Sequence, residues 1–452
     1  MKTKRFNFWA VLMVMFFSLS FVSCSEDDDD DDNGGEMMTN TITDVAASDA
    51  NFSILVDALK KVGLDDDLAD ANSMFTVFAP TNAAFADLLA ELGVDGLDDI
   101  SNDVLTSVLL YHVLPVSKTA NQIETGYYSS LSDGPADGYS LSFYVDMTMA
   151  KINNRSMIVQ TDVKADNGVI HAIDKVMLPM SITDHAVANP ASFSALAAAV
   201  TKAGLAEALD DETATYTVFA PVNDAFTTFL TDLGVALDDL TAEALAPIIL
   251  YHAIGDFVPA ADVSAGYFPT LSTAFEQNIK VKIDTEGGVM LNSSSHVVAT
   301  DVVATNGIIH AIDKVITPPS VVDIAIANAD FSILVEAVLK AELVDALSED
   351  GPFTVFAPTN TAFEALFATL QVSGIADLSK DDLTPILLAH VVSANAVSSG
   401  LSNGSVSTLN TEKMLEISIE NGVTIDGTIN VVAADIQGKN GVVHVIDKVI
   451  VP

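Results

Sequence analysis

Histidine is the residue type whose charge changes near neutral pH, and most of the histidines of this chain recur in fixed contexts. Six of the eight histidines belong to two repeated motifs. The first motif comprises Tyr111-His112, Tyr251-His252 and His390. The second places His171, His310 and His444 in runs that end in Ile-Asp-Lys-Val. Imidazole can bind a metal or act as a general base, so both motifs are candidate sites.

The spacing around these histidines argues against catalysis and metal binding. His171 and Asp174 are three residues apart, so on a strand they point to opposite faces. The chain contains no Gly-x-Ser-x-Gly, Walker or His-Glu-x-x-His motif. We therefore expect no enzyme activity, no catalytic residues, no cofactor and no dedicated metal. Weak calcium capture is an alternative for Asp65–Asp67, Asp98-Asp99 and Asp238-Asp239, which lack the spacing of an EF-hand loop.

A repeated stretch shows which elements must position these residues. Phe-Thr-Val-Phe-Ala-Pro-Thr-Asn-Ala-Ala-Phe, at 75–85, returns with small changes at 216–226 and 353–363. A period of about 140 residues is that of whole domains. The apolar run predicts a buried strand that ends at Pro80, and Thr81 or Asn82 can cap the helix that follows.

A second helix in each repeat carries the first histidine motif. Leu105, Val108, Leu109 and His112 are spaced at i, i+3, i+4 and i+7, which places His112 on the apolar stripe. Tyr111 is one step round, at the edge of that stripe. The Asn167-Gly168 pair then predicts the turn of a closing hairpin, whose returning strand contains His171.

These elements together resemble the fasciclin-type domain, from about residue 40 to residue 452. The resemblance and the patterns imply an α+β fold: three tandem fasciclin-like domains, each a small twisted β-sheet system, a sandwich or wedge, with several packed helices. We expect a lipoprotein signal peptide at 1–23, an acidic disordered tether at 24–40, and domains at 41–180, 181–319 and 320–452.

The N-terminal segment predicts export and a lipid anchor. Basic residues precede an apolar run from Phe8 to Val22 that is too short to span a membrane. Cys24, the only cysteine, follows a segment that resembles the lipobox of bacterial lipoproteins. The block from Asp27 to Asp32 resembles the surface-export signal of Bacteroidetes-type lipoproteins. We expect the protein to be located in the outer membrane and exposed at the cell surface.

The net charge of the chain is −43, and phosphate groups would be repelled by it. This charge excludes nucleic acid as a partner.

Two functions follow as expectations. The resemblance implies adhesion to an extracellular or cell-surface protein or matrix, because Tyr111-His112 and Tyr251-His252 match a motif implicated in integrin binding by animal members of the family. The third copy keeps His390 but has Ala389 in place of the tyrosine. The helical period instead favours packing for these histidines. The alternative function is glycan capture in support of polysaccharide uptake, by stacking on an aromatic pair in each of the first two repeats: Tyr127 with Tyr128, and Tyr267 with Phe268.

Overall fold

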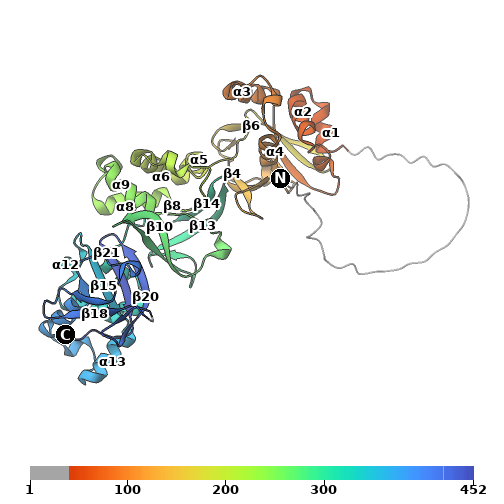
Figure 1. Cartoon of the computed structure of the whole chain (residues 1–452). Helices are drawn as coiled ribbons and strands as arrows, with labels where there is room; N and C mark the ends of the chain where they lie inside the picture. The colour runs from red at the N-terminus through yellow and green to blue at the C-terminus, as the bar shows by residue number, and fades with distance from the viewer. Residues whose placement is uncertain (1–39, 421) are drawn as a thin grey trace, which may run out of the picture. The chain divides into compact units, whose positions relative to one another are not determined.

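The computed structural model describes residues 40–420 and 422–452, so Cys24 and the predicted signal peptide and acidic block lie outside the described residues. The same order of helices and strands occurs three times along the described chain (Figure 1). None of the described helices has the length and apolar character needed to cross a membrane.

Each repeat has four or five α-helices and seven strands within the described residues. The first contains α1 Ile42–Ser48, α2 Ser53–Val62, α3 Asn82–Leu92, α4 Asn102–Tyr111, β1 Phe75–Pro80, β2 Val113–Leu114, β3 Gly126–Asp133, β4 Ser140–Asp146, β5 Lys151–Ile152, β6 Ser156–Ala165 and β7 Gly168–Ile173. The second contains α5 Ile182–Ala188, α6 Pro190–Ala203, α7 Ala206–Leu209, α8 Asn223–Leu233, α9 Ala242–Tyr251, β8 Tyr216–Pro221, β9 Ala253–Ile254, β10 Gly266–Ala274, β11 Gln277–Asp284, β12 Met290–Leu291, β13 Ser295–Ala304 and β14 Gly307–Ile312. The third contains α10 Val321–Ile326, α11 Ser332–Lys340, α12 Val344–Ser348, α13 Asn360–Leu370, α14 Lys380–Ala389, β15 Phe353–Pro358, β16 Val391–Val392, β17 Gly404–Ser407, β18 Met414–Ser418, β19 Thr424–Ile425, β20 Ile429–Gly438 and β21 Gly441–Ile446.

The strands of each repeat form one mixed, seven-stranded sheet. In the first repeat the order is β2-β1-β7-β6-β5-β4-β3, and the other repeats keep it. Only the β1–β7 pair is parallel, and it places Phe78 opposite His171. The repeated stretch therefore lies between the edge strand β2 and the returning strand of the closing hairpin.

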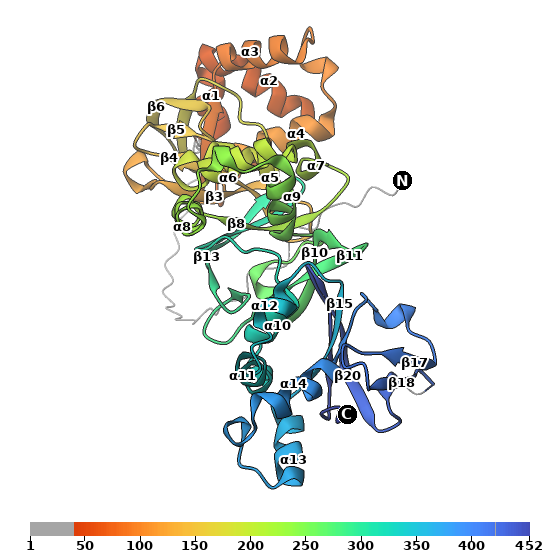
Figure 2. The same ribbon diagram turned by 90° about the vertical axis from the view of Figure 1, so that its left-hand side faces the viewer.

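Two cores cover the two faces of β1. Val77 and Ala79 of β1 pack into the core formed with the helices, whereas Phe78 packs into a second core with strand β4. Because neighbouring side chains of a strand point to opposite faces, β1 is buried along its whole length. Figure 2 shows the same two layers in the third repeat, with α11, α13 and α14 on one side of β15 and β17 and β18 on the other.

The predicted cap of the repeated stretch is confirmed. The Thr81 side chain accepts a hydrogen bond from the Ala84 amide, and Gly93 ends the helix α3 in the left-handed region, with φ of 67°. The second repeat has Val222 at the capping position, without a side-chain bond, and its helix α8 keeps the same length. Packing therefore defines this helix as much as its cap does.

The predicted Asn-Gly turn has a further role in packing. The Asn167 side chain is buried; it accepts from the Ile42 amide at 2.8 Å and donates to the Leu68 carbonyl at 2.8 Å. Gly168 has φ of 153°, and a Cβ there would lie 2.1 Å from the Phe75 carbonyl oxygen. The pair thus joins the start of α1 to the closing hairpin, and Asn306 and Asn440 repeat the contact.

Candidate functional site

The histidines of the first motif lie just past the ends of α4, α9 and α14, and each is fully enclosed. His112 Nδ1–H donates to the Val108 carbonyl at 2.6 Å, and its Nε2 accepts from the Met177 amide at 2.8 Å. The carbonyl partner requires the proton to be on Nδ1. The same pairs of bonds recur at His252 and His390.

Both ring nitrogens of these histidines are thus occupied by the backbone. Burial lowers the pKa of His112, His252 and His390 to about 4, so the rings are neutral at pH 7. A neutral imidazole with two internal bonds has no lone pair left for a metal, a substrate proton or a partner. The arrangement ties the end of the helix to the segment that follows the closing strand.

The tyrosines of the motif are also inside the protein. Tyr111 and Tyr251 are 0% exposed, although they lie one step round from the apolar stripe of their helices. The second core covers this side of the helix: the Tyr111 hydroxyl donates to the Ser142 carbonyl at 2.7 Å, and Phe143 packs against its ring. Direct contact of Tyr111, His112, Tyr251, His252 or His390 with a partner would require local opening of the domain.

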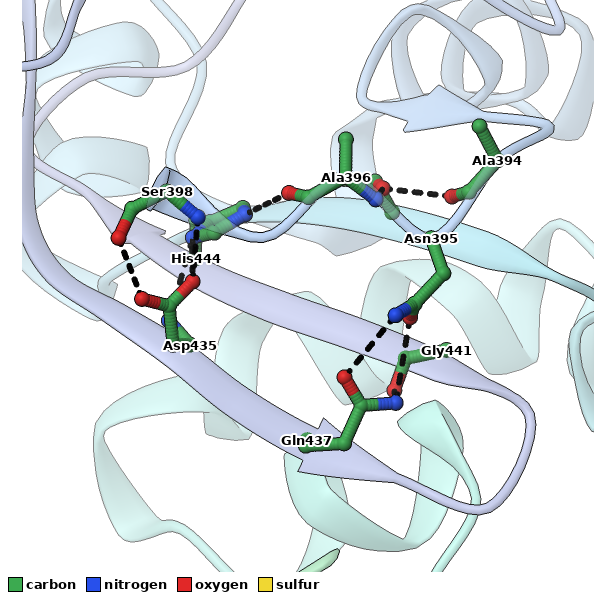
Figure 3. Close-up of polar contacts among 9 residues, drawn as sticks. Ala394, Asn395, Ala396, Ser398, Asp435, Gln437, Gly441 and His444 are labelled. Carbon is green, nitrogen blue, oxygen red and sulfur yellow. Dashed lines mark hydrogen bonds and ion pairs between the residues drawn. The ribbon is translucent and has the colours of Figure 1, made fainter. Parts of the chain in front are cut away.

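The histidines of the second motif connect the closing strand to a bulge and a loop. In the third repeat, His444 Nε2–H donates to the Ala396 carbonyl at 2.9 Å, and Nδ1 accepts from the Asp435 amide at 3.3 Å (Figure 3). Asp435 has φ of 63°, and its carboxylate accepts from the Ser398 amide at 2.7 Å. His171 with Asp162 and His310 with Asp301 repeat this arrangement. Burial lowers the pKa of all three histidines.

Ser398, Asp435 and His444 have the composition of a hydrolase triad but not its geometry. The Ser398 hydroxyl donates to the Asp435 carboxylate and not to the histidine (Figure 3). The histidine gives its Nε2 proton to a carbonyl, so it cannot take a proton from a serine. The residues of the first and second repeats that are equivalent to Ser398 are Ala120 and Ala260, which have no hydroxyl. This cluster was not foreseen from the sequence because its members lie in three separate segments.

Two of the three acidic clusters make contacts within their own domain. Asp98 lies 3.4 Å from the Lys61 ammonium, and Asp238 lies 3.8 Å from that of Lys202. Asp99 accepts hydrogen bonds from the Asp95 and Gly96 amides. Among residues 40–420 and 422–452, no three His, Cys, Asp or Glu side chains are placed to hold a metal ion together.

In each aromatic pair, one ring packs on its own repeat and the other packs on the next repeat. Tyr128 and Phe268 pack onto the second core of their own repeat. Tyr127 packs onto the next repeat, where its ring centroid lies 5.6 Å from that of His185, and Tyr267 packs onto the third repeat in the same way. All four rings are half-buried, so none offers a fully open face for a sugar.

His185 is a residue that the sequence reasoning missed. It lies on α5, is 0% exposed, and burial lowers its pKa to about 3. The corresponding positions in the other repeats hold Val45 and Ile324. A histidine at a position that is apolar in the other two repeats was the feature of the sequence that could have identified this residue. In the structure its ring contacts that of Tyr127.

Comparison with known proteins agrees with this geometry. The family model described as "Fasciclin domain" matches residues 50–179, 191–318 and 329–452. The chain belongs to the fasciclin family. The expected fold, three tandem fasciclin domains of the α+β class, is confirmed by this match and by the three mixed sheets.

Several relatives of this fasciclin protein match over most of its length. Transforming growth factor-beta-induced protein ig-h3 from Sus scrofa is 30% identical over 422 residues, which cover 92% of this chain and 58% of the relative. Human periostin is 28% identical over 88% of this chain and 45% of its own length. The chain thus spans about half the length of these relatives.

Two further matches cover smaller parts. Protein sll1483 of Synechocystis is 44% identical over 133 residues, 29% of this chain and 73% of the relative. A solved fasciclin domain pair from the insect cell adhesion molecule Fasciclin I covers 57% of this chain and 94% of that structure, with 17% identity and a TM-score of 0.36.

Proposed function

We propose that this fasciclin protein is an adhesion or interaction protein of the cell surface, which presents its three domains to extracellular protein or matrix partners. Membership of the fasciclin family supports this class of function. We further propose that lipid on Cys24 anchors the chain in the outer membrane. The proposal places no catalytic step in the protein, in agreement with histidines whose ring nitrogens are bonded within each domain.

The observation that favours a repeated binding surface is an exposed valine at the same position of each repeat. Val159, Val298 and Val432 are 56%, 58% and 59% exposed, on the first halves of β6, β13 and β20. Isolated exposed apolar residues are common on surfaces, but the same residue at three equivalent positions forms a regular array. Three weak contacts on one chain bind a multivalent partner much more tightly than one contact does.

Glycan capture has less support. Tyr127 and Tyr267 pack against the next domain, and Tyr128 and Phe268 pack against their own. A sugar that stacks on any of them would have to displace existing contacts.

The test is binding of the purified protein to an immobilised panel of extracellular matrix proteins and to a glycan array. We expect binding to matrix protein, and we expect V159D/V298D/V432D to weaken it by at least about tenfold, because three contacts lose apolar area together. Val104→Asp is the matched control, since Val104 is 56% exposed on α4, away from these strands. Equal binding by the triple variant would reject this surface, and glycan binding alone would favour the alternative function.

A further inference from the structure

Each repeat contains an apolar cavity at the same place, between its first two helices and the helix that ends in the Tyr-His motif. Its volume is about 20 Å³ in the first repeat, about 150 Å³ in the second and about 80 Å³ in the third. His112, His252 and His390 line the respective cavities. The fold therefore provides one site three times, and its size differs between the repeats.

Side-chain size at two equivalent positions follows the order of these volumes. The first repeat has Leu59 on α2 and Val113 on β2, and both line its small cavity. The second repeat has Val200 in place of the leucine, which is one carbon smaller, and Ala253 in place of the valine, which is two carbons smaller. The third keeps valine at the strand position and has Val338 on α11, and its cavity is intermediate. Surrounding atoms relax only partly around a smaller side chain, so the missing volume remains as space.

The walls of the large cavity are apolar, and its mouth is polar. Leu196, Val200, Leu209 and Ile249 are buried side chains of its interior. His252 presents no free ring nitrogen, because both are bonded to the backbone. Thr183, Asp184 and Thr201 lie at the mouth between α5 and α6, and Val187 beside them is 62% exposed. A molecule can thus enter between two helices and reach a site with almost no hydrogen-bonding groups.

We propose that the second domain binds a small uncharged apolar molecule, of the size of one aromatic ring, in this cavity. An engineered cavity of about 150 Å³ with similar apolar walls stays dry and binds benzene. A long acyl chain exceeds the volume, and a carboxylate or phosphate would lose its hydration against walls that cannot pair with it. The cavities of the first and third domains are too small for a ring of this size.

Isothermal titration of the full chain with benzene and with toluene tests the proposal. We expect one site per chain for at least one of the two probes. The variant V200L/A253V carries the residues of the first repeat at both positions, and we expect at least a tenfold loss of affinity together with a higher midpoint of thermal unfolding. Val338→Leu, which fills the third cavity, is the matched control and leaves the stoichiometry at one. Absence of binding of both probes, or full binding by V200L/A253V, overturns the proposal.

The reciprocal variant L59V/V113A makes the test independent of whether the filled variant folds. It carries the residues of the second repeat in the first, so we expect the number of sites to rise from one to two. An unchanged number in a folded L59V/V113A chain would show that these positions do not set the size of the site, and would overturn the proposal equally.

Discussion

At the scale of single residues, the histidines of the Tyr-His motif act as internal connectors. Each imidazole joins a helix carbonyl to an amide of the segment after the closing strand, at distances of 2.6–3.0 Å. No other neutral side chain has a donor and an acceptor on opposite sides of a flat ring of this size. This requirement explains a histidine in an apolar stripe without any partner outside the domain.

Replacement of His252 tests this role. We expect His252→Ala to destabilise the second domain by about 2–4 kcal/mol, because it leaves the Ile248 carbonyl and the Ile316 amide unpaired and enlarges the cavity. The rate of hydrogen exchange of the amides in strands β8 and β14, measured in the full chain, reports the effect. The exposed His296→Ala should stay within about 0.5 kcal/mol. An unchanged exchange rate in the His252 variant would contradict the structural role.

The depressed pKa values predict acid sensitivity. Unfolded histidine titrates near 6.5, whereas His112, His252 and His390 titrate near 4 in the folded protein. Between these values the unfolded chain binds more protons, so stability is complete above pH 6.5 and falls as the pH decreases toward 4. The loss is up to about 3 kcal/mol per domain.

Urea unfolding between pH 7 and pH 4 measures this loss. His252→Gln removes one titrating group and keeps a donor and an acceptor, so its curve for the second domain should be flatter over this range. A slope equal to that of the unchanged protein would show that another group is responsible.

At the scale of elements, the Asn-Gly pair before the last strand connects parts that are far apart in the sequence. Asn306 accepts from the amide of Ile182 at the start of α5 and donates to the carbonyl of Leu209 at the end of α7. It is 1% exposed, so these bonds do not compete with water. The first and last parts of the domain are thereby joined next to the large cavity.

Removal of this connection should loosen the first helix. We expect Asn306→Ala to cost about 1–3 kcal/mol, since the Ile182 amide and the Leu209 carbonyl remain buried without a partner. Faster hydrogen exchange in α5 and α7 is the measurement. Asn102→Ala, at an exposed position of α4, is the control and should change little. Equal exchange in α5 for the Asn306 variant and the unchanged protein would argue against the connection.

At the scale of the whole molecule, a tyrosine at the second position of β3 or β10 contacts the first helix of the next repeat. Tyr127 lies against α5. Tyr267 lines a hollow together with Ile324 of α10 and Ala327, the residue that follows this helix. Polar bonds accompany them: the Val303 amide donates to the Ser142 hydroxyl at 3.0 Å, and the Ser293 hydroxyl donates to the Ala327 carbonyl at 2.8 Å. The last repeat has the exposed Ser405 at this position.

Loss of one tyrosine should weaken one such contact. Tyr267 is half-buried, and burial raises the pKa of its hydroxyl to about 12. We expect Tyr267→Ala to destabilise α10 by about 1–3 kcal/mol, seen as faster hydrogen exchange of its amides, with α1 unchanged. Ser405→Ala is the matched control in the last repeat. If α10 exchanged at its normal rate in the Tyr267 variant, the contact would not contribute to stability.

The proposed anchor is tested separately. Cys24→Ser should abolish lipid labelling and release the protein from the membrane fraction, because serine has no thiol for the lipid. Asn33→Ala, further along the segment, should label normally. Lipid labelling of the Cys24 variant at the normal level would refute the anchor and would leave the interaction surface untouched.

The sequence by itself determined the repeats, the strand from Phe75, a helix cap at Thr81 or Asn82, and the apolar stripe that includes His112. These features depend on local dihedral preferences and on periods of two and 3.6 residues, which can be read from a single segment. Only the tertiary structure decided that Tyr111 is buried, that Tyr127 contacts the next domain, and that the cavity of the second domain is large. Each of these depends on the size and position of side chains from distant segments, such as Val200 on α6 and Ala253 on β9, and no local pattern encodes how such side chains meet.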